Sequence, residues 1–400
     1  MMRRRSSRSR TTGRSRTTSE MGSSLETWGL PDHLTTDQTE KLQDLKNRVS
    51  EADLQQIKFD VESQDSALCR YLRARKFDVD ASFEMIENCR NRRLEDGVSE
   101  CVQDGPSACL KCPAEVYKCF NPEWYVGFDK AHRLVSIQKP GLLNTAAIDC
   151  LTTTENILRY HWCNMEARNE QFRCAAEAYG EPNISMTIIT DLQGMTTSTM
   201  TKKVYHFINV ISKLGSDCYP ELMGKTYIVN APFFFVGVWR IIRSWIDQRT
   251  ASKIEISSGC DSEKLLEVID PDVLPVEYGG NAVGKIPKSS NALYSNLGRA
   301  SSHTKQVELK AGEEFIVQFF TNFSGIQYTV SFKPAGKKKV NQVKTAVSDT
   351  STDSGLFSME EIYSIPGQYT IKWKNTSKLH PKGVVYHIFA PSEPEKIIFC

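Results

Sequence analysis

The spacing of hydrophobic and polar positions changes twice along the chain and divides it into three parts. Between residues 25 and 96, apolar residues such as Leu68 and Leu72 recur at helical spacing. From 97 to 290, short apolar runs alternate with helical patterns. After Gly280 the apolar residues fall on every second position. This order predicts a helical segment, then an α/β domain, then an all-β domain.

Helix start signals support the first part. Short polar side chains before an apolar periodic run are typical N-caps, because they accept hydrogen bonds from the first free backbone amides. A helix is expected over Lys41–Arg48, and two more within the segment DSALCRYLRARKFDVDASFEMIENCRNRRLED. The expected caps are Thr36 or Asp37 for the first helix, Asp65 and Ser66 for the second, and Asp80 for the third.

The middle part alternates strand-like and helix-like runs, which favours an α/β domain with a largely parallel sheet. The expected strands are Leu134–Gln138, Ser185–Thr190, Thr226–Val229 and Lys253–Ile256. The expected helices are Glu155–Glu177, Met200–Leu214, residues 233–246 and Ser262–Ile269.

Period-two alternation in residues 304–333 and 367–390 predicts the strands of the last part, for example Phe315, Val317 and Phe319 on one face. The polar stretch Ala335–Ser354 separates the two segments. An antiparallel β-sandwich with a long loop or insertion is therefore expected.

The segment from 233 to 246 is unusually apolar for a helix of an α/β domain. On a helical wheel Arg240, Arg243 and Asp247 share one narrow stripe, and nearly every other position is apolar. Ordinary surface helices have a much narrower apolar face. Two interpretations follow: a helix buried on most sides, or a lid that covers an apolar ligand and touches a membrane.

Composition bounds these interpretations. A chain of 400 residues favours two folded domains plus tails. The net charge of +2 hides seven Arg in residues 1–20; residues 21–400 carry 43 basic and 47 acidic side chains, which argues against nucleic acid as a partner. Residues 1–24 hold no apolar residue but Met and are expected to form a disordered tail, a kinase target or an electrostatic tether to anionic lipid. A mitochondrial transit peptide would need an apolar face, which this stretch lacks.

The remaining features favour a cytoplasmic protein without catalytic chemistry. There is no apolar signal-peptide core, and the longest apolar stretch, Phe233–Trp239, is far too short to span a membrane. The twelve Cys are then expected to be reduced thiols. Cys109 and Cys112 form one CxxC that could hold zinc with Cys101 and Cys119, but the spacings are atypical. No phosphate-binding glycine loop or nucleophile elbow occurs and the seven His are scattered, so neither an enzyme nor a cofactor is expected.

Three stretches together resemble a known family. DSALCRYLRARKFDVDASFEMIENCRNRR is similar to the N-terminal helical segment of CRAL-TRIO proteins, and YPELMGKTYIVNAPFFFVGVW, with the later SKIEI and LPVEYGG, is similar to their lipid-binding domain. The part beginning near LGRASSHTKQVEL resembles the GOLD domain of the animal Sec-fourteen-like subgroup. The resemblance implies a helical segment at 35–96, an α/β CRAL-TRIO domain with a gate helix at 97–285, and an all-β GOLD sandwich at 295–395.

The resemblance also implies a site. Family members hold one lipid in an apolar pocket, with the helix after the NAP motif as its gate, and phosphoinositide-binding members contact the headgroup through the acid of YPE and the lysine of SKI. Here these are Glu221 and Lys253, with Thr250 beside them and Arg75 and Lys76 of LRARK in support. Position 222 is Leu where yeast-type members carry Arg, which weakens the phosphate site. The implied gate and pocket residues are Phe233, Phe234, Phe235, Val238, Trp239, Ile242, Trp245 and Ile246, with Ser185 and Thr187 as headgroup contacts from a neighbouring strand.

We therefore expect a non-enzymatic protein that binds phosphatidylinositol or a related phospholipid and transfers or presents it between membranes. A regulatory role in trafficking or signalling is expected, with only transient association with the membrane surface. A carrier of tocopherol or another isoprenoid is one alternative. A lipid-switched adaptor that binds a protein partner through the GOLD sandwich is another, and an apolar patch on the exposed face of strands 367–390 would favour it.

Overall fold

The structure is a computed structural model that describes residues 27–180, 183–283, 292–337, 339–351 and 356–390. The expected tail, residues 1–24, lies outside the described residues. The chain separates into two compact units, residues 1–90 and 91–400, and each is described by itself. Among the described residues, no helix combines the length and the hydropathy needed to cross a bilayer.

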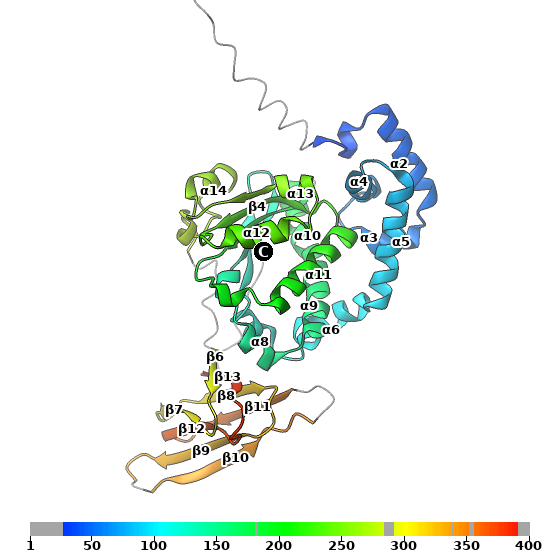
Figure 1. The fold of residues 1–400 in the computed structure, drawn as a ribbon. Helices are drawn as coiled ribbons and strands as arrows, with labels where there is room; N and C mark the ends of the chain where they lie inside the picture. The colour runs from blue at the N-terminus through cyan, green and yellow to red at the C-terminus, as the bar shows by residue number, and fades with distance from the viewer. Residues whose placement is uncertain (1–26, 181–182, 284–291, 338, 352–355, 391–400) are drawn as a thin grey trace, which may run out of the picture. The chain divides into compact units, whose positions relative to one another are not determined.

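The first unit is helical, as the sequence predicts (Figure 1). A short 3-10 turn, η1 (Pro31–His33), precedes α2 (Thr36–Arg48), α3 (Glu51–Ile57), α4 (Gln64–Ala74) and α5 (Val79–Glu95). Apolar positions at helical spacing, including Leu45, Leu68 and Leu72, are buried in its core. The predicted helix caps were wrong by one to three residues.

The correct caps stand earlier in the sequence. Thr35 caps α2 in a reciprocal capping box with Gln38, because both backbone amides at the helix start gain a partner. At the start of α4, the Ser63 hydroxyl accepts a hydrogen bond from the Ser66 amide. The cap is therefore Ser63 rather than Asp65 or Ser66. Before α5, the cap is Asp78 rather than Asp80: the Asp78 carboxylate accepts a hydrogen bond from the Ala81 amide at 3.0 Å.

A five-stranded sheet forms the centre of the second unit, in the order β1-β2-β3-β4-β5 (Figure 1). The β1–β2 pair is antiparallel and the other pairs are parallel. The prediction of an α/β domain with a largely parallel sheet is therefore confirmed, and β1 is the antiparallel strand. The strands are β1 (Glu123–Phe128), β2 (Arg133–Gln138), β3 (Asn183–Asp191), β4 (Met223–Val229) and β5 (Ile254–Ile256).

Helices connect these strands and cover the sheet. The predicted helix Glu155–Glu177 is two helices that meet at Ala167, and the helix predicted over 233–246 is only nine residues long. It is shorter because Asp247 caps a separate short helix after it, accepting from the Thr250 amide at 2.9 Å. The helices are α6 (Val98–Leu110), α7 (Ala114–Lys118), η2 (Pro140–Leu142), α8 (Thr145–Leu151), α9 (Thr154–Glu166), α10 (Arg168–Tyr179), η3 (Thr197–Thr199), α11 (Lys202–Cys218), α12 (Phe235–Arg243), α13 (Gln248–Ser252), α14 (Ser262–Val268) and η4 (Val276–Tyr278).

The last part is an antiparallel sandwich of two four-stranded sheets, ordered β10-β9-β12-β7 and β11-β8-β13-β6. Alternate residues of β8, β9 and β12 fill its core around the fully buried Trp373, which confirms the period-two pattern. The polar stretch Ala335–Ser354 is not only a loop, because it contains β10 at a sheet edge. The strands are β6 (Leu293–Leu297), β7 (Ser302–Leu309), β8 (Phe315–Thr321), β9 (Ile326–Pro334), β10 (Asn341–Val347), β11 (Phe357–Tyr363), β12 (Gly367–Asn375) and β13 (Lys382–Phe389).

Candidate functional site

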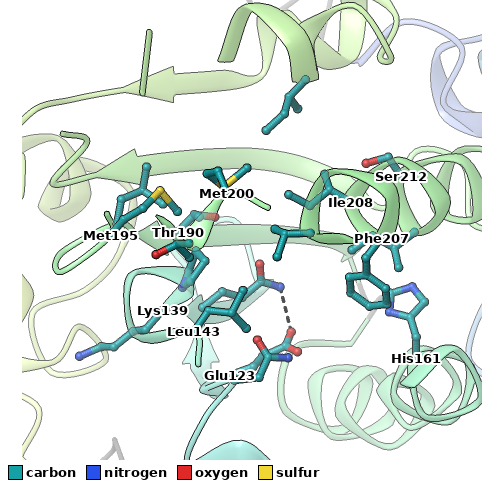
Figure 2. A pocket seen from close by; sticks show the side chains of 18 of the residues that line it. Glu123, Lys139, Leu143, His161, Thr190, Met195, Met200, Phe207, Ile208 and Ser212 are labelled. Atoms are coloured by element: carbon teal, nitrogen blue, oxygen red, sulfur yellow. Dashed lines mark hydrogen bonds between the residues drawn. The ribbon is translucent and has the colours of Figure 1, made fainter. Parts of the chain in front are cut away.

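The second unit contains a cavity of about 420 Å³ beside the sheet (Figure 2). This volume lies within the range of about 300–1,000 Å³ that is typical of small-molecule pockets. Most lining side chains are apolar and come from α8, α9, α11, α12 and the ends of the central strands. Such a cavity suits a hydrophobic ligand, since the hydrophobic effect favours removing apolar ligand surface from water.

Helix α12 forms one wall of the cavity. Phe235, Val238, Trp239 and Ile242 lie at the i, i+3, i+4, i+7 spacing that places them on one helix face, and all four line the cavity. Phe235 and Val238 also pack on Leu192 and Ile228 of the sheet. Ile246, Thr250 and Ile254 continue this wall beyond the end of α12.

The opposite face of α12 is exposed and apolar. Val236 is 65% exposed and Ile241 45%, and Phe233, two residues before the helix begins, is 97% exposed. Arg240 and Arg243 are exposed on the same helix. The interpretation of a helix buried on most sides is therefore wrong: α12 is a surface helix with apolar residues on both faces.

Three residues expected in the pocket are not among those that line it. Phe233 points into solvent, as its exposure shows. Phe234 is half-buried and packs on the apolar cluster around α12. Trp245 lies edge-on to Tyr205, with ring centroids 6.3 Å apart.

Strand β3 meets the cavity through Thr190, not through Ser185 and Thr187. Successive side chains of a strand point to opposite faces, so 185 and 187 share one face and 190 lies on the other. The Thr187 hydroxyl donates to the buried Asp129 carboxylate at 2.7 Å, and the Ser185 hydroxyl donates to Asn183 at 2.6 Å. The expected headgroup contacts from this strand were therefore assigned to the wrong face.

A charged cluster joins the starts of β4 and β5. The Lys253 ammonium donates to the Glu221 carboxylate at 3.3 Å and to the Met223 carbonyl at 2.8 Å. Arg249 lies 3.5 Å from the same carboxylate. Glu221 adopts a left-handed backbone, with φ +63°, at the turn that leads into β4. The structure thus brings together two residues that are 32 positions apart, and it adds Arg249, which the sequence analysis did not include.

Thr250 links this cluster to the cavity. Its side chain lines the cavity, and both its amide and its hydroxyl donate to Asp247. Hydrogen bonding to Thr250 holds the pKa of Asp247 below its usual value, although burial opposes this shift. The carboxylate therefore stays charged and fixes the turn that carries Arg249 and Lys253.

Arg75 and Lys76 belong to the first unit, at the C-terminal end of α4. Arg75 is the C-cap residue, and Lys76 follows in a left-handed conformation with φ +53°. Lys76 is exposed and Arg75 is half-buried. Their expected role in supporting a headgroup stays a prediction.

Four side chains give the cavity a polar wall that the sequence analysis did not predict: Glu123 of β1, His161 and Asn164 of α9, and Arg168 of α10. The Glu123 carboxylate accepts from Asn164 at 3.2 Å. Gln138 donates to Glu123 at 3.0 Å, and Ser136 at 3.3 Å. These residues lie scattered over 46 positions and match no motif, so only the fold brings them together.

Two basic side chains of this wall, Arg168 and His161, differ in charge. The Arg168 guanidinium is buried and donates from Nε to the Tyr125 hydroxyl at 3.1 Å. Burial opposes its charge, but Tyr125 and Glu123 outweigh this effect and raise its pKa. For His161, burial and then the charge of Arg168 lower the pKa to about 4, so the ring is neutral at pH 7. The Nε2 atom of His161 is buried and has no hydrogen-bond partner among the described residues.

The cysteines of the CxxC stretch are separate from the cavity. Cys101, Cys109 and Cys112 are buried free thiols, and burial raises the pKa of Cys112 to about 12. Throughout the described part of the chain, no group of three or more His, Cys, Asp or Glu side chains is placed to hold a metal ion.

Comparisons with known proteins match the part of the chain that contains the sheet and the cavity. A model of the CRAL/TRIO domain matches residues 121–280, and a model of the CRAL/TRIO N-terminal domain matches residues 41–88. The SEC14 cytosolic factor of Eremothecium gossypii is 33% identical over 279 residues, which are 68% of this chain and 84% of that protein.

Other relatives are longer. The SEC14 cytosolic factor of Yarrowia lipolytica is 34% identical over 64% of this chain and 51% of its own length, so the chain spans about half of it. The phosphatidylinositol/phosphatidylcholine transfer protein SFH9 of Arabidopsis thaliana is 33% identical over 54% of this chain and 36% of its own length. The crystal structure of Sfh5 matches with a TM-score of 0.50 at 18% identity, covering 64% of this chain and 92% of Sfh5, and it supports the fold alone. Residues after 280 lie outside both matched family models.

Proposed function

The chain belongs to the CRAL/TRIO family, and from this premise we propose that it binds one phospholipid, phosphatidylinositol or a close relative, and transfers or presents it between membranes. The observation that carries the proposal is the apolar cavity walled by α12. Relatives in Arabidopsis carry the name phosphatidylinositol/phosphatidylcholine transfer protein, which is consistent with this class of ligand.

The acyl chains occupy the cavity in this proposal. Each buried methylene contributes about 0.8 kcal/mol to keeping the lipid inside. No covalent step is needed, because exchange consists of removing the chains from the cavity and inserting them into a bilayer. The protein must therefore lower the cost of exposing the chains to water on the way.

Helix α12 supplies this step. Its inner face covers the ligand. Its outer face, through Val236 and Ile241, and Phe233 just before the helix are offered to the acyl boundary of a membrane. Arg240 and Arg243 suit the anionic headgroups beside them. Docking of the outer face on a membrane would favour outward movement of α12 and open the cavity directly to the bilayer.

The charged cluster of Glu221, Arg249 and Lys253 is the proposed headgroup site. A phosphodiester at the edge of an apolar cavity needs compensating cations, and Lys253 and Arg249 provide them. Glu221 orients both cations and can accept hydrogen bonds from inositol hydroxyls. Thr250 connects this cluster to the cavity wall, so headgroup and chains would lie on one continuous surface.

The exposed positions of β12 bear on the adaptor alternative. They carry Gln368, Lys372 and Lys374, and the second face of β13, with Val385 and His387, is buried. The described residues of strands 367–390 therefore lack the exposed apolar patch that would favour the adaptor hypothesis. A GOLD-mediated protein partner stays a prediction without this support.

Lipid transfer between vesicles tests the proposal. Donor vesicles carry fluorescent phosphatidylinositol or phosphatidylcholine with a quencher, and acceptor vesicles carry neither. We expect the purified chain to accelerate transfer of phosphatidylinositol. We also expect mass spectrometry to identify phosphatidylinositol among the lipids extracted from the protein. Failure of both measurements would refute phospholipid transfer, and recovery of an isoprenoid alone would favour the tocopherol-type alternative.

A further inference from the structure

The polar wall contains a buried polar atom without a hydrogen-bond partner, in a cavity whose lining is mostly apolar. Buried polar groups in folded proteins nearly always have hydrogen-bond partners. Here the buried Nε2 of His161 has none among the described residues, although His161 lines the cavity (Figure 2). The described protein atoms supply no partner for this atom, so a partner would have to come from a ligand group that reaches the ring.

Arg168 also contributes hydrogen-bond donors to this wall. A guanidinium carries five N–H donors in a fixed plane. Among the described residues, only its Nε–H has a partner, the Tyr125 hydroxyl at 3.1 Å. The side chain is buried and lines the cavity, so its remaining donors are available to a group inside it.

The charges of the cavity wall decide what kind of group fits. Arg168 is balanced by the carboxylate of Glu123, and His161 is neutral at pH 7. The other charged residues of the lining are paired as well: Lys139 with Glu277 at 2.6 Å, and Lys203 with Asp149. The described wall therefore has no unbalanced cation for an anion. An uncharged oxygen can accept from Arg168 and bond to His161 without burying a new charge.

We propose that His161 and Arg168 form a specificity site inside the cavity that selects lipids carrying an uncharged oxygen, either a hydroxyl or a carbonyl, at the point where the lipid meets the polar wall. The inference rests on the proposed function, because it requires a lipid in the cavity. It adds that a pure hydrocarbon is a poor ligand, since it would leave Nε2 and the guanidinium donors without partners. Phe207 and Ile208 of α11 line the same cavity and would hold the adjoining apolar part.

Three ligands that differ only in the head group test this inference: hexadecan-1-ol, hexadecane and hexadecanoate, delivered from cyclodextrin to the delipidated full-length chain. Each competes with a fluorescent hydrocarbon probe, diphenylhexatriene, at pH 8. We expect hexadecan-1-ol to bind about tenfold more tightly than hexadecane, as one good hydrogen bond to a buried group implies. Hexadecanoate should bind less tightly than the alcohol. A preference for hexadecanoate or for hexadecane would overturn the proposal.

Variants assign the preference to the wall. His161→Phe should reduce the advantage of the alcohol to threefold or less while leaving hexadecane affinity unchanged or higher. His161→Gln, which keeps a hydrogen-bonding group, should retain most of the advantage. His206→Phe, the same change at an exposed histidine of α11 outside the cavity lining, serves as the control. Equal loss for alcohol and alkane in His161→Phe would mean a structural role and would refute the site. The proposed function fails separately, if wild type takes up neither diphenylhexatriene nor phospholipid.

Discussion

The ammonium of Lys253 and the carboxylate of Glu221 lie 3.3 Å apart, although the two residues precede different strands of the sheet, β5 and β4. Their side chains are only 22% and 10% exposed, so solvent screens the pair incompletely. The Met223 carbonyl fixes the ammonium from a second side at 2.8 Å. This geometry holds a cation in place beside Thr250, which is itself part of the cavity wall.

Removing this pair should abolish recognition of an anionic headgroup. We expect Glu221→Gln combined with Lys253→Met to slow vesicle transfer of phosphatidylinositol by roughly 10–100-fold, because hydrogen bonds to charged groups contribute about 1.5–3 kcal/mol each. Uptake of diphenylhexatriene should stay normal, since the apolar cavity is unchanged. Lys264→Met removes another paired lysine, on α14, and should leave transfer as it is. Normal transfer by the double variant would refute the headgroup assignment.

The exposed face of α12 leads to a kinetic prediction. Phe233→Asp should slow lipid exchange at least fivefold, because a buried Phe contributes about 1.5–3 kcal/mol and Asp cannot enter the acyl region. The melting temperature should stay within about 2 °C of wild type, since Phe233 is 97% exposed and has little native packing to lose. Stopped-flow fluorescence transfer measures the rate.

Val276→Asp is a matched control, because Val276 is 58% exposed and lies on η4 instead of α12. It should leave the exchange rate near wild type. If Phe233→Asp and Val276→Asp behave alike, α12 has no special role at the membrane.

The order of elements could be predicted from the sequence because periodicity reports which face of an element is buried. The strands at Leu134–Gln138 and Thr226–Val229, and the alternation of β8, β9 and β12, follow directly from that rule. The helix caps were misplaced because Thr35, Thr36 and Asp37 are all good caps, and only backbone geometry chooses among them.

The candidate site was only partly predictable. Glu221 and Lys253 could be paired through a resemblance. That Thr190 lines the cavity and Thr187 does not depends on which face of the sheet meets the cavity, and the sequence does not give this. The polar wall could not be found at all, because His161 and Arg168 become neighbours of Glu123 only once α9 and α10 pack beside β1. Sequence periodicity describes one helix or strand at a time, whereas this site is formed by three elements: β1, α9 and α10.

The basic N-terminus leads to a salt-dependent prediction. Residues 1–20 contain seven Arg and one Glu, and each basic residue near an anionic membrane contributes about 1 kcal/mol at the surface. Deleting residues 1–22 should therefore weaken binding to phosphatidylserine vesicles at least tenfold in low salt. The difference should shrink in about 0.5 M salt, as shorter screening lengths require. Vesicle sedimentation measures both, and equal binding in low salt would contradict the tether.

A buried ion pair should control the stability of the first unit. The guanidinium of Arg70 donates to the Glu62 carboxylate at 2.7 and 2.8 Å, and the side chains are 5% and 1% exposed. Arg70→Met alone should lower the free energy of unfolding by about 3–5 kcal/mol, because it leaves a buried carboxylate without its partner. Combining it with Glu62→Leu should recover most of this loss. Urea denaturation followed by circular dichroism checks both variants, and equal destabilisation would contradict the explanation.

His161 should make the second unit less stable in mild acid. Burial, with the nearby charge of Arg168, lowers the pKa of His161 from 6.5 in the unfolded chain to about 4 in the fold. Between these values the unfolded chain binds a proton that the folded chain does not, so stability falls as the pH drops from 6.5 towards 4. The cost between pH 7 and pH 5 is at most about 2 kcal/mol, at 1.36 kcal/mol per pKa unit. The Glu123 carboxylate, which also belongs to the polar wall, acts in the opposite sense and reduces this cost.

The variant His161→Gln isolates this effect from all other titrating groups. Gln keeps a polar side chain on α9 but does not titrate in this range. Urea denaturation of both proteins at pH 7 and pH 5 should therefore show a smaller loss of unfolding free energy in the variant, by roughly 1–2 kcal/mol. An identical pH dependence would mean that folding leaves the pKa of His161 unchanged, which would contradict this explanation.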